Sequence, residues 1–91
     1  MALLGESPDR MSVDIRVLFF GATAAEVGQR VLELSLADNS TAESGFELVV
    51  EKFPQLKRHK LLHALNQNYA AGDEVLCNGD ELAIFTAVSG G

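Results

Sequence analysis

Apolar residues in this chain follow two spacings, and the first is strict alternation near the N-terminus. In residues 13–20 one set of alternate positions is entirely apolar: Val13, Ile15, Val17 and Phe19. The positions between them begin with Asp14 and Arg16 and end with Leu18 and Phe20. Because alternate side chains of a strand point to opposite faces, this stretch predicts a β-strand with one core face. Its other face is polar at one end and apolar at the other.

The second spacing, every third or fourth residue, predicts a single main helix. Its apolar stripe consists of Phe46, Val49, Val50 and Phe53, the pattern of an amphipathic helix with one buried side. Ser40 and Glu43 have the spacing of a capping box at the helix start, and Pro54 ends the helix. We interpret the stripe as core packing and not as a cofactor site.

Shorter runs predict the remaining elements. They are a connector over 21–28 with a helical turn over 24–27, and strands over 29–36, 61–66, 75–76 and 81–85, of which 75–76 is a brief edge strand. A short irregular stretch is expected to begin at Tyr69. One helix cannot cover both faces of a sheet, so the order β-β-α-β-(short β)-β predicts an α+β fold. We expect a mixed four- to five-stranded sheet with one main helix packed on one face, an order that fits the β-grasp, or ubiquitin-like, arrangement.

A chain of 91 residues is long enough for one domain. We expect three regions along it: a disordered N-terminal extension over 1–12, the folded domain over 13–85, and a flexible tail over 86–91.

Composition narrows the classes of function. The net charge of -6 and the sequence pI of about 4.7 disfavour nucleic acid binding, which needs a basic face, and suit a partner with a basic docking surface. Cys77 is the only cysteine, so neither an intrachain disulfide nor a cysteine-based zinc site can form. His59 and His63 lack metal-site spacing, and we expect no bound metal. No apolar run approaches the ~20 residues of a membrane span, and a cytoplasmic location is expected.

The best candidate for chemistry is the C-terminal stretch Thr86-Ala87-Val88-Ser89-Gly90-Gly91. Glycine has no side chain to block a narrow passage, and six extended residues reach at most about 20 Å, enough to enter a pocket on another protein. The carboxylate of Gly91 can be activated as an acyl adenylate and then accept a nucleophile. No nucleophile–base pair or phosphate-binding loop is evident elsewhere. A frayed, inert tail is the simpler alternative.

Five segments carry a resemblance to a known family. They are Val17-Leu18-Phe19-Phe20-Gly21-Ala22 with Ala25-Glu26-Val27-Gly28, Lys52-Phe53-Pro54-Gln55-Leu56, Ala64-Leu65-Asn66-Gln67-Asn68-Tyr69, Gly79-Asp80-Glu81-Leu82-Ala83, and Val88-Ser89-Gly90-Gly91. In this order they are similar to the MoaD-like sulfur carriers, the small subunits of molybdopterin synthase, over residues 13–91. That family commonly has two prolines where this chain has Thr86 and Ala87, so a less stiff tail is expected here.

The resemblance implies a role for Gly91 as the reactive residue. A ubiquitin-activating-like adenylyltransferase would consume ATP to form a glycyl adenylate, and a sulfurtransferase donor would convert it to a thiocarboxylate (1-thioglycine). Val88, Ser89 and Gly90 would then enter the synthase large subunit, where the sulfur attacks the cyclic pterin precursor to build the dithiolene of molybdopterin. A thiocarboxylate is a better nucleophile than a carboxylate. The implied carrier holds no permanent cofactor, is not catalytic alone, and forms a heterotetramer of two small and two large subunits.

Other readings of the same tail remain open. A sulfur carrier for thiamine or for tRNA thiolation would use it with different partners. A ubiquitin-like protein modifier would attach it to lysines of target proteins. A plain interaction domain would leave it inert.

Three aromatic residues are candidates for the partner interface. Phe20 lies on the predicted strand face opposite Phe19, Phe85 ends the last strand, and Tyr69 follows the third. By resemblance the first and last strands are neighbours, so these rings are expected to form one apolar patch beside the tail, and such patches mark binding sites. The alternative is that Phe20 or Phe85 belongs to the core.

Overall fold

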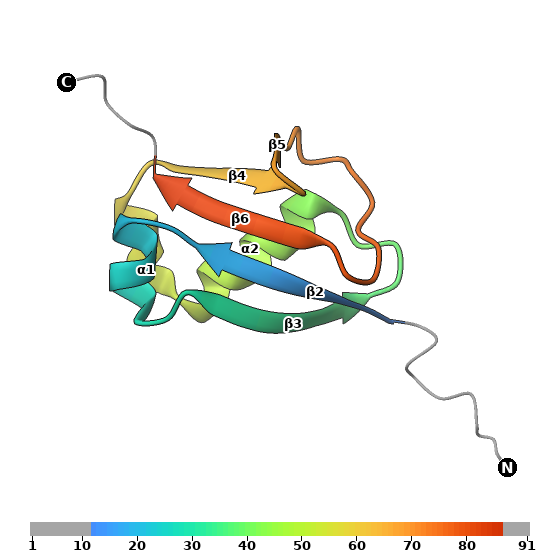
Figure 1. Ribbon diagram of the computed structural model, residues 1–91, viewed down its shortest axis with the longest axis horizontal. Helices are drawn as coiled ribbons and strands as arrows, with labels where there is room; N and C mark the ends of the chain where they lie inside the picture. Colours follow the sequence, from blue (N-terminus) through green and yellow to red (C-terminus); the bar gives the residue numbers. More distant parts are fainter. Residues whose placement is uncertain (1–11, 87–91) are drawn as a thin grey trace, which may run out of the picture.

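The computed structural model describes residues 12–86, which form a five-stranded sheet in the order β3-β2-β6-β4-β5. Five strands and three helical segments follow one another along the chain: β2 (Ser12–Phe19), α1 (Ala22–Val27), β3 (Val31–Ala37), α2 (Ala42–Lys52), the 3-10 helix η2 (Pro54–Arg58), β4 (Leu61–Leu65), β5 (Asn68–Tyr69) and β6 (Glu81–Thr86). The first and last strands, β2 and β6, pair in parallel at the centre, and the other pairs are antiparallel. The expected mixed sheet with one main helix is confirmed (Figure 1).

The core lies between the sheet and α2, which crosses one face of it (Figure 1). Alternate residues of β2 are buried there, as the alternation predicted: Val13, Ile15, Val17 and Phe19. Leu82 and Ile84 of β6 are buried with them. Gly45 brings α2 close to the sheet, because a Cβ at this position would lie 3.3 Å from side-chain atoms of both Leu76 and Leu82. The close approach explains a glycine that weakens the isolated helix by about 1 kcal/mol relative to alanine.

The start of α2 differs from the sequence-based expectation. Its N-cap is Thr41, whose hydroxyl accepts a hydrogen bond from the backbone N–H of Ser44, so the predicted capping box of Ser40 and Glu43 is wrong. Thr41 also forms an isolated antiparallel bridge with Val75. The bridge holds Thr41 in an extended conformation, and the helix therefore begins one residue later.

Two further expectations are corrected in the segment after β4. Asn66 and Gln67 both have positive φ and turn the chain into β5, so Tyr69 belongs to a strand paired with Ala64 instead of an irregular stretch. The predicted edge strand over 75–76 is only the single bridge at Val75, and Leu76 is a buried core residue. Both outcomes depend on contacts between segments distant in sequence.

The predicted helical turn over 24–27 is a six-residue helix, α1, which lies at the end of the sheet where β6 stops (Figure 1). Gly21 precedes it with φ 58°, and Gly28 closes it in the left-handed conformation. This short helix connects the end of β2 to the start of β3 and packs near the end of β6.

Candidate functional site

The root of the C-terminal tail, defined here as Thr86 at the end of β6, lies at an ordered edge of the domain. Thr86 pairs with Leu61 at the start of β4, and the pairing of Phe19 with Ile84 places the end of β2 on its other side. The predicted tail residues Val88, Ser89, Gly90 and Gly91 lie outside the described residues. Thr86, the last residue described, therefore lies at the end of β6 with β4 on one side and β2 on the other.

An apolar surface lies beside this root on the sheet face that α2 does not cover. We define the open-face patch as Phe20, Leu62, Tyr69 and Phe85. The exposed fractions are 52% for Phe20, 76% for Tyr69 and 37% for Leu62, and Phe85 is half-buried. The ring centroids of Tyr69 and Phe85 are 6.0 Å apart, and Leu62 pairs with Phe85 across the β4–β6 ladder.

The structure brings the rings of Tyr69 and Phe85 together, and Phe20 and Tyr69 are surface residues. Phe20 directly follows the Phe19–Ile84 pair, the last pair of the parallel ladder, and its backbone N–H donates to the Ile84 carbonyl at 3.2 Å. Sequence analysis missed Leu62. Its outward position follows from the alternation of β4, but its place next to Phe85 depends on the β4–β6 register, which no local pattern reveals.

The other half of the open face is polar, as the β2 alternation predicted. Arg16 forms an ion pair with Glu33 across the β2–β3 ladder at 3.4 Å, with both side chains largely exposed. Asp14 accepts a hydrogen bond from the hydroxyl of Ser35. Charged residues therefore occupy the far end of the open face, and the apolar side chains gather near the tail root.

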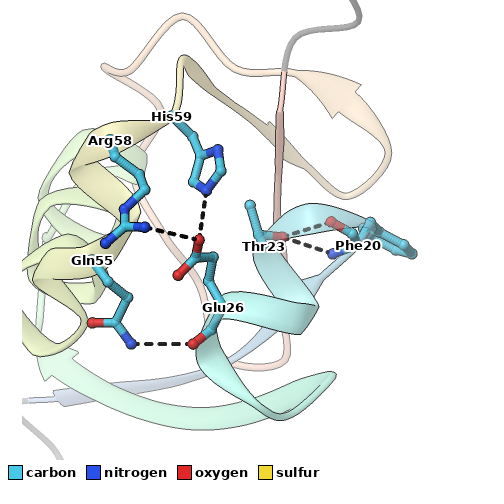
Figure 2. A network of polar contacts seen from close by, with 6 residues as sticks. All are labelled: Phe20, Thr23, Glu26, Gln55, Arg58 and His59. Atoms are coloured by element: carbon cyan, nitrogen blue, oxygen red, sulfur yellow. Dashed lines mark hydrogen bonds and ion pairs between the residues drawn. The ribbon is translucent and has the colours of Figure 1, made fainter.

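A polar network fixes α1 against η2 at the same end of the molecule (Figure 2). Glu26 receives a hydrogen bond from His59, with 3.0 Å between Oε2 and Nε2, and lies 4.0 Å from Arg58. The side-chain amide of Gln55 donates to the Glu26 carbonyl at 3.2 Å. The hydrogen bond from His59 is the main reason that the pKa of Glu26 falls below its usual value, and the nearby charge of Arg58 lowers it further.

The remaining candidates for chemistry from the sequence are His63 and Cys77. The ring of His63 stacks on Phe46 with centroids 4.6 Å apart, and Cys77 is an exposed free thiol. Within residues 12–86 no cluster of histidine, cysteine, aspartate or glutamate could hold a metal ion. No helix in this part of the chain is long and apolar enough to cross a membrane.

The proteins to which this chain is similar include sulfur carrier subunits and a small archaeal modifier protein. The profile of the ThiS family matches residues 17–91. A molybdopterin synthase sulfur carrier subunit of Arabidopsis thaliana is 36% identical over 88 residues, 94% of this chain and 92% of that protein. A subunit of the same name from Haemophilus influenzae is 36% identical over 81 residues, 85% of this chain and 99% of that protein. SAMP1 from Haloferax volcanii has a TM-score of 0.76 at 26% identity, covering 86% of this chain and 99% of that chain.

The sheet, its covering helix and these neighbours define a ubiquitin-like β-grasp protein. The match over residues 17–91 shows that the chain belongs to the ThiS family. The resemblance to sulfur carriers seen in the five sequence segments is confirmed by the relatives that carry this name.

Proposed function

We propose that this chain is the sulfur-carrier small subunit of a molybdopterin synthase. The observation that carries the proposal is the alignment with relatives named molybdopterin synthase sulfur carrier subunit, over 94% of this chain in one case and 85% in another. The family match extends through Gly91 and so includes the Gly-Gly sequence on which the chemistry depends.

The proposed chemistry takes place on the α-carboxyl group of Gly91. An adenylyltransferase partner transfers AMP from ATP to the carboxylate and releases pyrophosphate, which converts a poor electrophile into an acyl adenylate. Sulfur at the oxidation level of sulfide, supplied by the sulfurtransferase, then attacks the carbonyl carbon, AMP leaves, and a thiocarboxylate remains. The carrier supplies the reactive terminus and its position, and the catalytic side chains belong to the partners.

The open-face patch is the proposed docking surface for the synthase large subunit. Its support is the exposure of Phe20 and Tyr69 on a sheet face that α2 leaves uncovered, and the position of Phe85 immediately before Thr86. Aromatic side chains bury large areas on association and often dominate the binding energy. A partner bound to this patch would also be close to Thr86, from which the tail continues. The assembly we propose contains two small and two large subunits.

Conjugation to proteins is the second candidate function. It is favoured by the fold similarity to SAMP1, called small archaeal modifier protein 1 in a second structure. A modifier also uses an activated C-terminal glycine, but a lysine amine of the target takes the place of sulfur as the nucleophile.

Mass spectrometry of the C-terminal peptide tests the proposal. After incubation with the activating enzyme, ATP and a sulfur donor, the chain is expected to gain the mass difference between sulfur and oxygen at Gly91. A variant lacking Gly91 is the matched control and should gain nothing. The charged carrier, mixed with the large subunit and the pterin precursor, should then yield molybdopterin.

An unmodified peptide, obtained with an enzyme that charges another carrier, would contradict the proposal. Isopeptide adducts on lysines of other proteins, with no thiocarboxylate, would support the modifier function instead.

A further inference from the structure

Thr23 is the one polar residue classed as buried among residues 12–86, and its side chain lies between the ends of the two central strands. Its Oγ1 is 3.0 Å from the backbone nitrogen of Phe20 and 2.7 Å from the carbonyl oxygen of the same residue. It is also 2.9 Å from the carbonyl oxygen of Ile84 in β6. One hydroxyl group thus contacts both strands where they approach the tail root.

The hydrogen-bonding capacity of a hydroxyl explains why this contact holds two strands at once. Oγ1 accepts from the N–H of Phe20 and has a single proton to donate, which either the Phe20 or the Ile84 carbonyl can accept. Phe20 is a member of the open-face patch, and Ile84 lies two residues before Thr86. The hydroxyl therefore couples a proposed docking residue to the end of β6.

The helix that carries Thr23 is itself fixed. Three residues later, Glu26 is tied to Gln55 and His59 of the following segment, so α1 has a polar anchor on one side and the Thr23 contact on the other. Figure 2 shows both contacts along α1, with the ring of Phe20 directed away from the hydroxyl. The buried Thr23 hydroxyl holds the backbone of Phe20, and the Phe20 ring remains available to a partner.

We propose that Thr23 is a positioning residue for the sulfur carrier, an inference that rests on the function proposed above. Its hydroxyl orders Phe20 and the end of β6 before a partner arrives. Association then costs less conformational entropy, because the docking ring and the tail root are already in place. Binding affinity gained in this way depends on the hydroxyl, and not on the apolar volume of the side chain.

The comparison of Thr23→Val with Thr23→Ser isolates the hydroxyl. Valine keeps the branched shape, and two backbone bonds remain at this site, Phe20 N–H to the Ile84 carbonyl and Thr23 N–H to the Phe20 carbonyl, both at 3.2 Å. In Thr23→Val we expect the amide exchange of Phe20 to rise about tenfold and the affinity for the large subunit to fall about tenfold, the loss expected for about one hydrogen bond. Thr23→Ser should have the wild-type amide exchange rate of Phe20 and the wild-type affinity, although serine lacks the methyl group. Exchange of the Leu34 amide in β3 should stay unchanged in both variants.

Wild-type exchange and affinity in Thr23→Val would overturn the proposal, as would equal losses in the valine and serine variants, because packing would then explain them. If Thr23→Val does not fold, Thr23→Ala replaces it, since alanine differs from serine only by the hydroxyl. Unfolding of both would show a structural role and not a positioning one. If the wild-type chain fails to bind the large subunit, the proposed function falls, while the exchange of Phe20 still decides whether Thr23 holds this residue.

Discussion

Two adjacent phenylalanines at the end of β2 have opposite environments. Phe19 is buried and packs edge-to-face against Phe53, with ring centroids 6.0 Å apart. Phe20, the next residue, points to the open face and is half exposed. The alternation of a strand places one ring in the core and the other on the surface. Phe19 is therefore expected to contribute to folding stability and Phe20 to partner binding.

Replacing each ring by alanine should have different effects. Phe20→Ala is expected to leave the free energy of unfolding within about 0.5 kcal/mol of wild type, as for an exposed site, and to weaken association with the large subunit. Phe19→Ala is the matched control and should cost about 3–5 kcal/mol of stability, because it opens a cavity in the core. Thermal unfolding and titration calorimetry measure the two effects. A large stability loss in Phe20→Ala would place its ring in the core, and a stable variant with normal binding would remove it from the interface.

A bulky residue at Gly90 should affect chemistry and not folding. Every core residue identified within residues 12–86 precedes Thr86, so Gly90→Phe is expected to keep the wild-type melting temperature. Sulfur transfer should fall steeply, because the new side chain enters a passage proposed to fit glycine. In a single-turnover assay, the sulfur-transfer rate of Gly90→Ala should lie between those of the wild type and Gly90→Phe. Full activity of Gly90→Phe would mean that the tail meets no narrow passage.

At the scale of elements, both helices take part of their geometry from segments distant in sequence. The N-terminus of α2 is tied to the loop before β6, since the N–H of Ala42 donates to the Glu74 carbonyl at 2.8 Å and that of Glu43 to the Gly72 carbonyl at 3.0 Å. Helix α1 is tied to η2 through Glu26. These tertiary contacts stabilise helices that are too short to be stable in isolation.

The N-cap of α2 can be identified by mutation. Thr41→Ala should lower the free energy of unfolding by about 1 kcal/mol, because the Ser44 N–H loses its side-chain acceptor. The matched control is Ser40→Ala, which removes the neighbouring hydroxyl and should cost much less. Urea unfolding of both variants checks this, and a larger cost for Ser40→Ala would restore the capping box expected from the sequence.

The network of Glu26 should make stability depend on pH on the acidic side. Its pKa in the folded protein is lowered, chiefly by the hydrogen bond from His59. The stabilisation is therefore fully present above the ordinary pKa of glutamate and is lost as the pH falls through the lowered folded pKa. Glu26→Gln should remove this part of the pH dependence, whereas Glu51→Gln, an exposed change of the same charge, should retain it. Unfolding measured across the acidic range would contradict the assignment if wild type and Glu26→Gln had parallel profiles.

At the scale of the whole molecule, charge and apolar surface are separated along the sheet. The chain carries a net charge of -6, the Arg16–Glu33 pair lies on the polar half of the open face, and the open-face patch adjoins the tail root. An acidic protein is steered toward a basic partner by long-range attraction, while the apolar patch contributes after contact.

Association with the large subunit should therefore slow as salt is added. Stopped-flow measurements are expected to show a lower association rate constant at higher ionic strength and a dissociation rate constant that changes little. Phe20→Ala should instead raise the dissociation rate constant and leave the salt dependence of the association rate constant unchanged. An association rate independent of salt would show that charge does not steer the encounter.

Local patterns in the sequence determined much of this protein. Alternation in residues 13–20 placed Phe19 inside and Phe20 outside, and the apolar stripe located α2, because both periodicities are properties of short segments. The five family segments identified the sulfur-carrier relatives, and the Gly-Gly stretch at Gly91 supplied the proposed chemistry.

Tertiary structure alone decided how these pieces meet. The resemblance made the first and last strands neighbours, but their parallel register came only from the structure. The β4–β6 register that sets Leu62 beside Phe85 and the Thr41–Val75 bridge likewise join residues far apart in the chain. Such pairings depend on backbone hydrogen bonds, which every residue type except proline can donate, so the side-chain pattern of one strand does not specify its partner. For the same reason the contact of Thr23 with Ile84, across 61 residues, became visible only when the strands were placed side by side.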